Sequence, residues 1–168
     1  AEGIPHNPHL DVGMMIEVPS AAVIADRLAP HVDFFSVGTN DLVQYSLAVD
    51  RSNPDISYLY QPSHPSIIRM LQHVVQAVYA HGKWIGVCGE MASEPLLVPL
   101  LLGLGIHELS MSPLSIPAVK QLVRHVRMCE AEALVEEAEK CGTAEEVLCL
   151  CREFIGRVPP DILSALDR

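Results

Sequence analysis

The stretch Val32-Asp33-Phe34-Phe35-Ser36-Val37-Gly38-Thr39-Asn40-Asp41 indicates how this chain folds. Its first part, residues 32–38, is a short apolar run with the length and composition of a buried strand. The polar turn of residues 39–41 follows directly and leads into a segment with further apolar positions. A strand that gives way at once to a polar turn and a helix is the unit from which the rest of the chain is also built.

Three more strands are predicted, at residues 12–18, 84–90 and 107–112. Helical segments separate them. The clearest has apolar residues at positions 67, 71, 74, 75 and 78, followed by Gly82 where a C-terminal stop is expected.

The other helical segments are marked by capping residues and prolines. Ser20 is expected to cap a helix that runs through Leu28, and Pro99 is expected to kink the Leu-rich segment that opens at Ser93 and Pro95. A fourth helix is predicted from Ile116 through Val126 and beyond. Thr143 and Glu146 predict a capping box for a last helix.

Four successive strand–helix units predict a parallel sheet with helices packed outside it. Both an open doubly wound sheet and a (β/α)8 barrel fit this α/β pattern. Polar residues at the strand ends favour the barrel, because barrel enzymes build their active sites there. These residues are Glu17, Asn40, Asp41, Cys88, Glu90, Ser110 and Ser112. A complete barrel takes eight units and ~250 residues, so four units predict half a barrel.

Composition narrows the class of protein. The 168 residues predict one domain, with 49% apolar and 19% charged residues. The net charge of −10 argues against nonspecific binding to nucleic acid or an anionic membrane. No signal peptide is recognisable, and the apolar stretch 96–106 is far shorter than the ~20 residues of a membrane span. The odd count of five cysteines favours a reducing cytoplasm, and the missing initiator Met suggests a piece cut from a longer chain.

Two acids at predicted strand ends are candidate metal ligands. If their strands are neighbours, Glu17 and Asp41 converge, and two carboxylates with water and substrate phosphate are a usual Mg²⁺ site. Two unrelated solvated acids fit the same spacing. The backbone N–H groups of the turn 38–41 and the Asn40 amide could bind an anion. An ordinary strand-to-helix turn without a ligand has the same sequence pattern. The guanidinium of Arg51 is suited to bidentate phosphate binding. The alternative is that Arg51 is a surface residue without such a role.

Cys88 lies at the end of the third predicted strand, between Val87 and Gly89. A lone cysteine is more often a small buried hydrophobe than a catalyst. Its place at the rim of the sheet, with Glu90 nearby, also allows an acid or thiolate role. Cys141, Cys149 and Cys151 lack the spacing of a zinc site.

The sequence of residues 33–51 resembles the signature of the phosphoenolpyruvate-utilising enzymes. Residues 14–21, 86–92 and 108–113 resemble further blocks of that family, and together the likeness covers about residues 12–155. The Gln-Tyr, Ala-Val-Asp-Arg and Glu-Met-Ala sequences favour the group called enzyme I, the phosphoenolpyruvate–protein phosphotransferases, over the related dikinases and synthases. Ser93-Glu94 departs from the Gly-Asp usual in that group.

The resemblance implies a function and a set of roles. The family transfers the phosphoryl group of phosphoenolpyruvate to a protein histidine and releases pyruvate, with Mg²⁺ as cofactor, at the head of a sugar or nitrogen-regulatory phosphotransferase system. By match to the family's motifs, Glu17 and Asp41 are the metal ligands, and Asn40, Asp41 and Arg51 bind substrate. Cys88 matches the acid that protonates the enolate of pyruvate at its methylene carbon.

The resemblance also implies what lies elsewhere. Residues 1–168 would be the C-terminal portion of the family's barrel domain, with C-terminal helices from about residue 116. The phosphoaccepting histidine and the contact to a phosphocarrier protein belong to an N-terminal domain, so this piece is expected to be inactive alone. A homodimer is expected, because relatives dimerise through this part and a bare half-barrel exposes two sheet edges. The alternatives are a non-catalytic self-association module, or a fragment of a dikinase or synthase.

Overall fold

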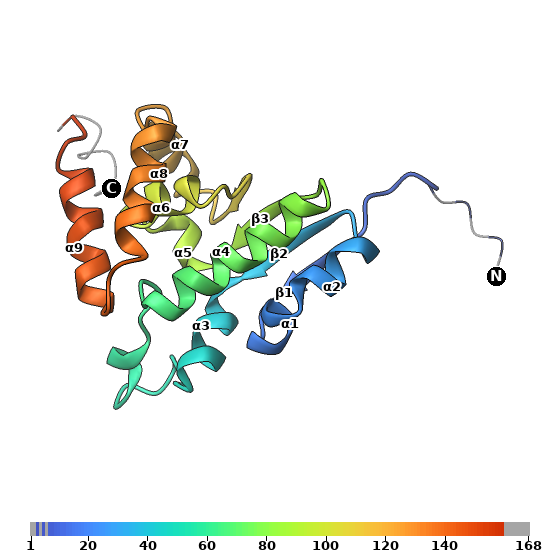
Figure 1. Ribbon diagram of the computed structural model, residues 1–168, viewed down its shortest axis with the longest axis horizontal. Helices are drawn as coiled ribbons and strands as arrows, with labels where there is room; N and C mark the ends of the chain where they lie inside the picture. The colour runs from blue at the N-terminus through green and yellow to red at the C-terminus, as the bar shows by residue number, and fades with distance from the viewer. Residues whose placement is uncertain (1–2, 4, 6, 160–168) are drawn as a thin grey trace.

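The computed structural model describes Gly3, Pro5 and residues 7–159. Its sheet consists of four parallel strands, β1 (Gly13–Ile16), β2 (Phe34–Gly38), β3 (Trp84–Cys88) and β4 (Glu108–Ser110). They lie side by side in sequence order, β1-β2-β3-β4 (Figure 1). A doubly wound sheet reverses its strand order at a switch point, whereas a barrel adds each strand next to the previous one. The structure therefore confirms the α/β fold class and agrees with the four-unit half of a (β/α)8 barrel.

The two faces of the sheet differ. Phe35, Val37 and Ile85 lie on the face that the helices cover and are fully buried. On the opposite face no helix packs within the described residues, and Met15 keeps 48% of its surface exposed. There Phe34 stacks on its register partner Trp84, with ring centroids 4.2 Å apart. In a closed barrel this uncovered face would be the interior.

The helices follow the strands in order. Within the described residues they are α1 (Pro19–Val23), α2 (Ala25–Leu28), α3 (Thr39–Leu47), α4 (Pro65–Ala80), α5 (Glu90–Ser93), α6 (Val98–Gly103), α7 (Ile116–Val123), α8 (Met128–Ala138) and α9 (Ala144–Ile155). Short 3₁₀ turns occupy Ala29–His31 and Ser57–Leu59. No helix in the described part of the chain is long and apolar enough to cross a membrane.

Three predicted helix boundaries are wrong. Ser20 does not cap α1, which begins at Pro19 because proline's fixed φ suits the first helical position. Pro99 does not kink a helix, since α6 begins only at Val98 and places the proline in its first turn. The helix predicted from Ile116 onward ends at Val123, and α8 begins as a separate helix at Met128.

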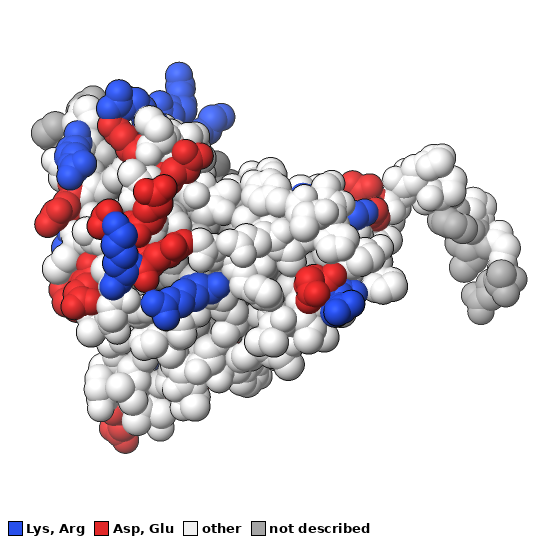
Figure 2. All heavy atoms as spheres, in the orientation of Figure 1, with Lys and Arg blue, Asp and Glu red and all other residues white. Residues whose placement is uncertain are grey.

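The best-marked helices are confirmed. α4 ends just before Gly82, whose φ of +63° reverses the chain as the sequence predicts. The Thr143–Glu146 capping box is present at the start of α9. Charged side chains gather over α8 and α9, whereas the surface over α4 carries far fewer of them (Figure 2).

Candidate active site

The predicted site residues lie at the carboxyl ends of β1, β2 and β3, which are neighbours in the sheet. Glu17 follows the last residue of β1, and Asn40 and Asp41 lie in the first turn of α3, directly after β2. Cys88 is the last residue of β3, and Glu90 opens α5. The strands that carry the two candidate metal ligands are paired in register, as the metal hypothesis requires.

Glu17 lies across the end of β2. A Cβ atom built on Gly38 would stand 3.0 Å from the Glu17 Cβ and 3.1 Å from its Oε2. The missing side chain at Gly38 therefore makes room for the Glu17 carboxylate at the mouth of the sheet. On the other side of Gly38, its register partner is Cys88.

The carboxylates of Glu17 and Asp41 are both half-buried. Within residues 7–159 neither makes an ion pair or a side-chain hydrogen bond. Two hard oxygen donors at neighbouring strand ends, without a basic partner among the described residues, are the donor set that Mg²⁺ prefers. No cluster of three or more His, Cys, Asp or Glu side chains that could hold a metal exists in the described part of the chain.

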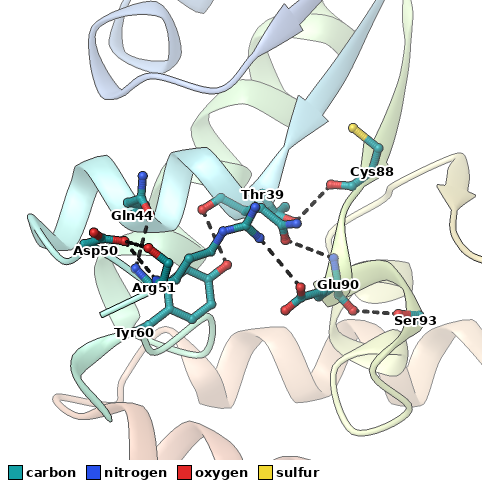
Figure 3. A network of polar contacts seen from close by, with 10 residues as sticks. Thr39, Gln44, Asp50, Arg51, Tyr60, Cys88, Glu90 and Ser93 are labelled. Atoms are coloured by element: carbon teal, nitrogen blue, oxygen red, sulfur yellow. Dashed lines mark hydrogen bonds and ion pairs between the residues drawn. The ribbon is translucent and has the colours of Figure 1, made fainter. Parts of the chain in front are cut away.

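The Cys88 thiol points to the uncovered face of the sheet. Its Sγ lies 3.7 Å from the Met15 Sδ and 3.5 Å from the Ser36 Oγ. Glu90 lies on the other side of the Cys88 backbone, and the thiol points away from it (Figure 3). The nearness of Glu90 in sequence had allowed it to take part in the chemistry of Cys88. The orientation of the thiol argues against that role.

Thr39 and Gly89 join the ends of β2 and β3. The buried Thr39 hydroxyl donates a 3.0 Å hydrogen bond to the Cys88 carbonyl oxygen. Gly89 has a φ of +113°, and a Cβ there would stand 2.7 Å from the Asn40 Oδ1. Only glycine allows both this backbone conformation and this close approach.

The Asn40 side chain has a fixed orientation. Its Oδ1 accepts a 3.0 Å hydrogen bond from the backbone N–H of Glu90. Because the amide oxygen is used in this way, the amide NH₂ group is left to donate to a ligand. The Asn40 backbone carbonyl accepts from the Tyr60 hydroxyl at 3.4 Å.

Arg51 is brought back to the site by the loop after α3. The loop begins at Ala48, which has a φ of +51° and ends the helix. The backbone N–H of Arg51 donates to the Gln44 Oε1 at 3.2 Å, and its guanidinium lies 3.6 Å from the Glu90 carboxylate (Figure 3). Glu90 therefore links the two groups: its carboxylate pairs with Arg51, and its backbone N–H binds the Asn40 amide oxygen.

Tyr60 borders this cluster. Burial, and secondarily the negative charge of Glu90, raises the pKa of the Tyr60 phenol above its usual value of 10.0. The phenol is therefore neutral at physiological pH and remains a hydrogen-bond donor. Sequence reasoning did not identify Gln44 and Tyr60 as site residues. It named Thr39 only within the turn 38–41, and Gly89 only as the neighbour of Cys88.

The chain resembles proteins of known type. A family model described as "PEP-utilising enzyme, PEP-binding domain" matches residues 1–128. The chain is 50% identical over 154 residues to the phosphoenolpyruvate-protein phosphotransferase of Enterococcus faecalis, covering 91% of this chain and 27% of that protein. It is 48% identical over 155 residues to that of Lactococcus lactis (92% and 27%) and 48% over 147 residues to that of Geobacillus stearothermophilus (88% and 25%). The chain thus spans about a quarter of the length of these relatives.

Proposed function

Because this chain belongs to the family of PEP-utilising enzymes, we propose that it is the C-terminal half-barrel of a phosphoenolpyruvate–protein phosphotransferase. The reaction moves the phosphoryl group of phosphoenolpyruvate to a histidine outside this chain and releases pyruvate. The similar proteins are named phosphoenolpyruvate-protein phosphotransferases, which supports this reaction over that of a dikinase or synthase.

The observation that carries the proposal is the arrangement around Gly38. Glu17 lies over this glycine from β1, and Cys88 is its register partner on β3. A substrate seated above Gly38 would therefore have a carboxylate that can hold a metal on one side and a thiol on the other. Asp41, three residues further along, lies in the first turn of α3.

Each residue has a defined task in the proposed reaction. Glu17 and Asp41 would hold the Mg²⁺, which when bound would supply positive charge to the phosphate and the departing enolate. The Asn40 amide and the Arg51 guanidinium donate to the phosphate oxygens. As the bond between phosphorus and the bridging oxygen breaks, its electron pair passes to the pyruvate enolate and the phosphoryl group passes to the histidine. The Cys88 Sγ–H then donates its proton to the methylene carbon, and solvent reprotonates the thiolate.

The proposal also includes the domain to which the chain belongs, its binding partners and its cellular compartment. Residues 1–168 would form one portion of the barrel domain, with the C-terminal helices from about residue 116 packed against it. The substrate is phosphoenolpyruvate, the product is pyruvate, and a phosphocarrier protein receives the phosphoryl group by way of an N-terminal domain. A cytoplasmic homodimer fits the acidic, cysteine-containing composition and the open sheet edges at β1 and β4.

Metal binding tests the proposal directly. Mn²⁺ is titrated into the chain by water-proton relaxation enhancement, with and without phosphoenolpyruvate. Asp41→Asn removes one of two carboxylate ligands. It is expected to weaken Mn²⁺ binding by at least about 10- to 100-fold, the loss seen when only an outer-shell partner of a metal ligand is removed. Asp55→Asn changes an exposed acid of the loop between α3 and α4 and serves as the matched control. Equal Mn²⁺ affinity in Asp41→Asn and the parent chain would refute the metal assignment.

Phosphoryl transfer tests whether the accepting histidine lies outside this chain. Alone, the chain is expected not to become labelled by phosphoenolpyruvate that carries ³²P in its phosphate. Mixing it with a separately expressed N-terminal portion of a relative, holding the histidine domain and the remaining barrel units, is expected to give labelled histidine. Labelling of the isolated chain would contradict this assignment.

A further inference from the structure

We propose that Glu90 is a positioning residue, whose carboxylate holds the Arg51 guanidinium beside Asn40 for binding of the substrate phosphate. The inference rests on the proposed function, in which Arg51 and Asn40 bind that phosphate. It assigns to Glu90 a task that is separate from the metal ligands and from the proton donor Cys88.

The backbone of Glu90 is fixed relative to Asn40. Its N–H donates to the Asn40 Oδ1 at 3.0 Å, and Gly89 just before it packs against the same amide. Glu90 is also the first residue of α5, so its backbone conformation is set by a helix start. The carboxylate thus projects from a point that is tied to one phosphate-binding group.

Arg51, in contrast, is a long side chain on a loop. Its backbone is held by Gln44, but 39% of its side chain is exposed, and in the described structure the one carboxylate that pairs with it is that of Glu90. An unpaired arginine side chain has many rotamers and loses that freedom on binding a ligand. A guanidinium has five N–H donors, so it can keep Glu90 at one edge and offer another edge to a phosphate.

The position of Glu90 argues against a role as a proton donor. The thiol of Cys88 points away from it, toward Met15 and Ser36. The Glu90 side chain is 76% exposed, which does not suit a proton donor that must be kept from water. Its ion pair with Arg51 is the contact that the described structure offers for its carboxylate.

Glu90→Gln tests the proposal, because it removes the charge and leaves the backbone hydrogen bond to Asn40 in place. Binding of phosphoenolpyruvate to the Mn²⁺-loaded chain is measured by ³¹P relaxation. Glu90 and Glu90→Gln are compared first in the chain that keeps Arg51 and then in the chain with Arg51→Met. We expect affinity to fall about two- to fivefold in the first, the range for exposed ion pairs, and not to change in the second. Glu94→Gln changes an exposed acid just after α5; it is the control and is expected to leave affinity unchanged.

Pyruvate separates positioning from a general structural effect. It lacks the phosphate, so Glu90→Gln is expected to leave its binding to the Mn²⁺-loaded chain unchanged. An equal loss for pyruvate and phosphoenolpyruvate, an equal loss in both Arg51 backgrounds, or tighter phosphoenolpyruvate binding would each overturn the proposal. Absence of phosphoenolpyruvate binding by the parent chain would overturn the proposed function as well, whereas normal parent binding with no effect of Glu90→Gln would overturn the positioning role alone.

Discussion

Charged side chains are used differently in the helical region α8–α9 and at the carboxyl ends of the strands. In α8–α9, acids pair with bases close by in sequence: Arg127 with Glu130, Lys140 with Glu137, and Arg152 with Glu145. At the strand ends, Glu17 and Asp41 are half-buried and have no basic partner among residues 7–159. Unpaired carboxylates cost stability unless something else binds them. The contrast supports the proposal that the strand ends bind a cation, whereas the charges of α8–α9 are already paired with one another.

The packing of α8 supports this division. α8 lies against α6 so closely that a Cβ on Gly103 would meet the Ala131 backbone carbonyl oxygen. The side chains of Ala131, Leu134 and Val135 are buried in the same core as the strands. The family model ends at residue 128, where α8 begins. All proposed site residues precede that point, so the proposed site and the region α8–α9 are consecutive along the chain.

The strongest test of the contrast is Cys88→Ala in the enzyme reconstituted with its N-terminal portion. Turnover is expected to fall about 10²–10⁴-fold, because enolate protonation loses its general acid. Mn²⁺ affinity is expected to be unchanged, since Cys88 is not a proposed ligand. Cys88→Ser should be nearly as slow, because a hydroxyl is a far weaker acid than a thiol. Full turnover in Cys88→Ala would make Cys88 a packing residue and shift the boundary between the two regions.

The sequence predicted the four strands from local patterns, but three of the predicted strands run two residues past the ends of β1, β3 and β4, and only the end of β2 is exact. A polar residue after an apolar run places Glu17, Asn40, Asp41 and Cys88 without any knowledge of tertiary contacts. The Glu90–Arg51 pair and the Tyr60 contact depend on how a loop of more than a dozen residues folds back, which no local pattern encodes. The same reason explains the errors at Pro19 and Pro99: proline can kink a helix or begin it, and only packing decides which.

A second test concerns the region α8–α9. Gly103→Ala is expected to lower the free energy of unfolding by about 1–3 kcal/mol, because its methyl group must displace the α8 backbone rather than a flexible side chain. Urea unfolding measures this effect. Gly142→Ala is the control: its Cβ would meet only the Glu146 carboxylate, at an ordinary 3.7 Å. If both variants are equally stable, α8 is not held as tightly against α6 as the structure shows.

The smallest expected effect lies at the start of α9. The Thr143 hydroxyl accepts from the Glu146 N–H, and the Glu146 carboxylate accepts from the N–H groups of Gly142 and Thr143. Thr143→Ala is expected to cost about 0.5–2 kcal/mol in the free energy of unfolding at pH 7, since it removes the cap. The metal site lies outside this helix, so Mn²⁺ affinity is expected to be unchanged.

The capping box also has a pH signature. The hydrogen bonds from Gly142 and then Thr143 lower the pKa of Glu146 below its usual value of 4.5. A lowered folded-state pKa means that the contribution of Glu146 is fully present above about pH 4.5 and is lost as the pH falls through the folded value. Glu146→Gln is therefore expected to flatten this part of the acid unfolding curve, whereas Glu132→Gln, an exposed acid of α8, leaves it unchanged. Equal acid curves for the parent and Glu146→Gln would show that the charge of Glu146 does not stabilise the start of α9.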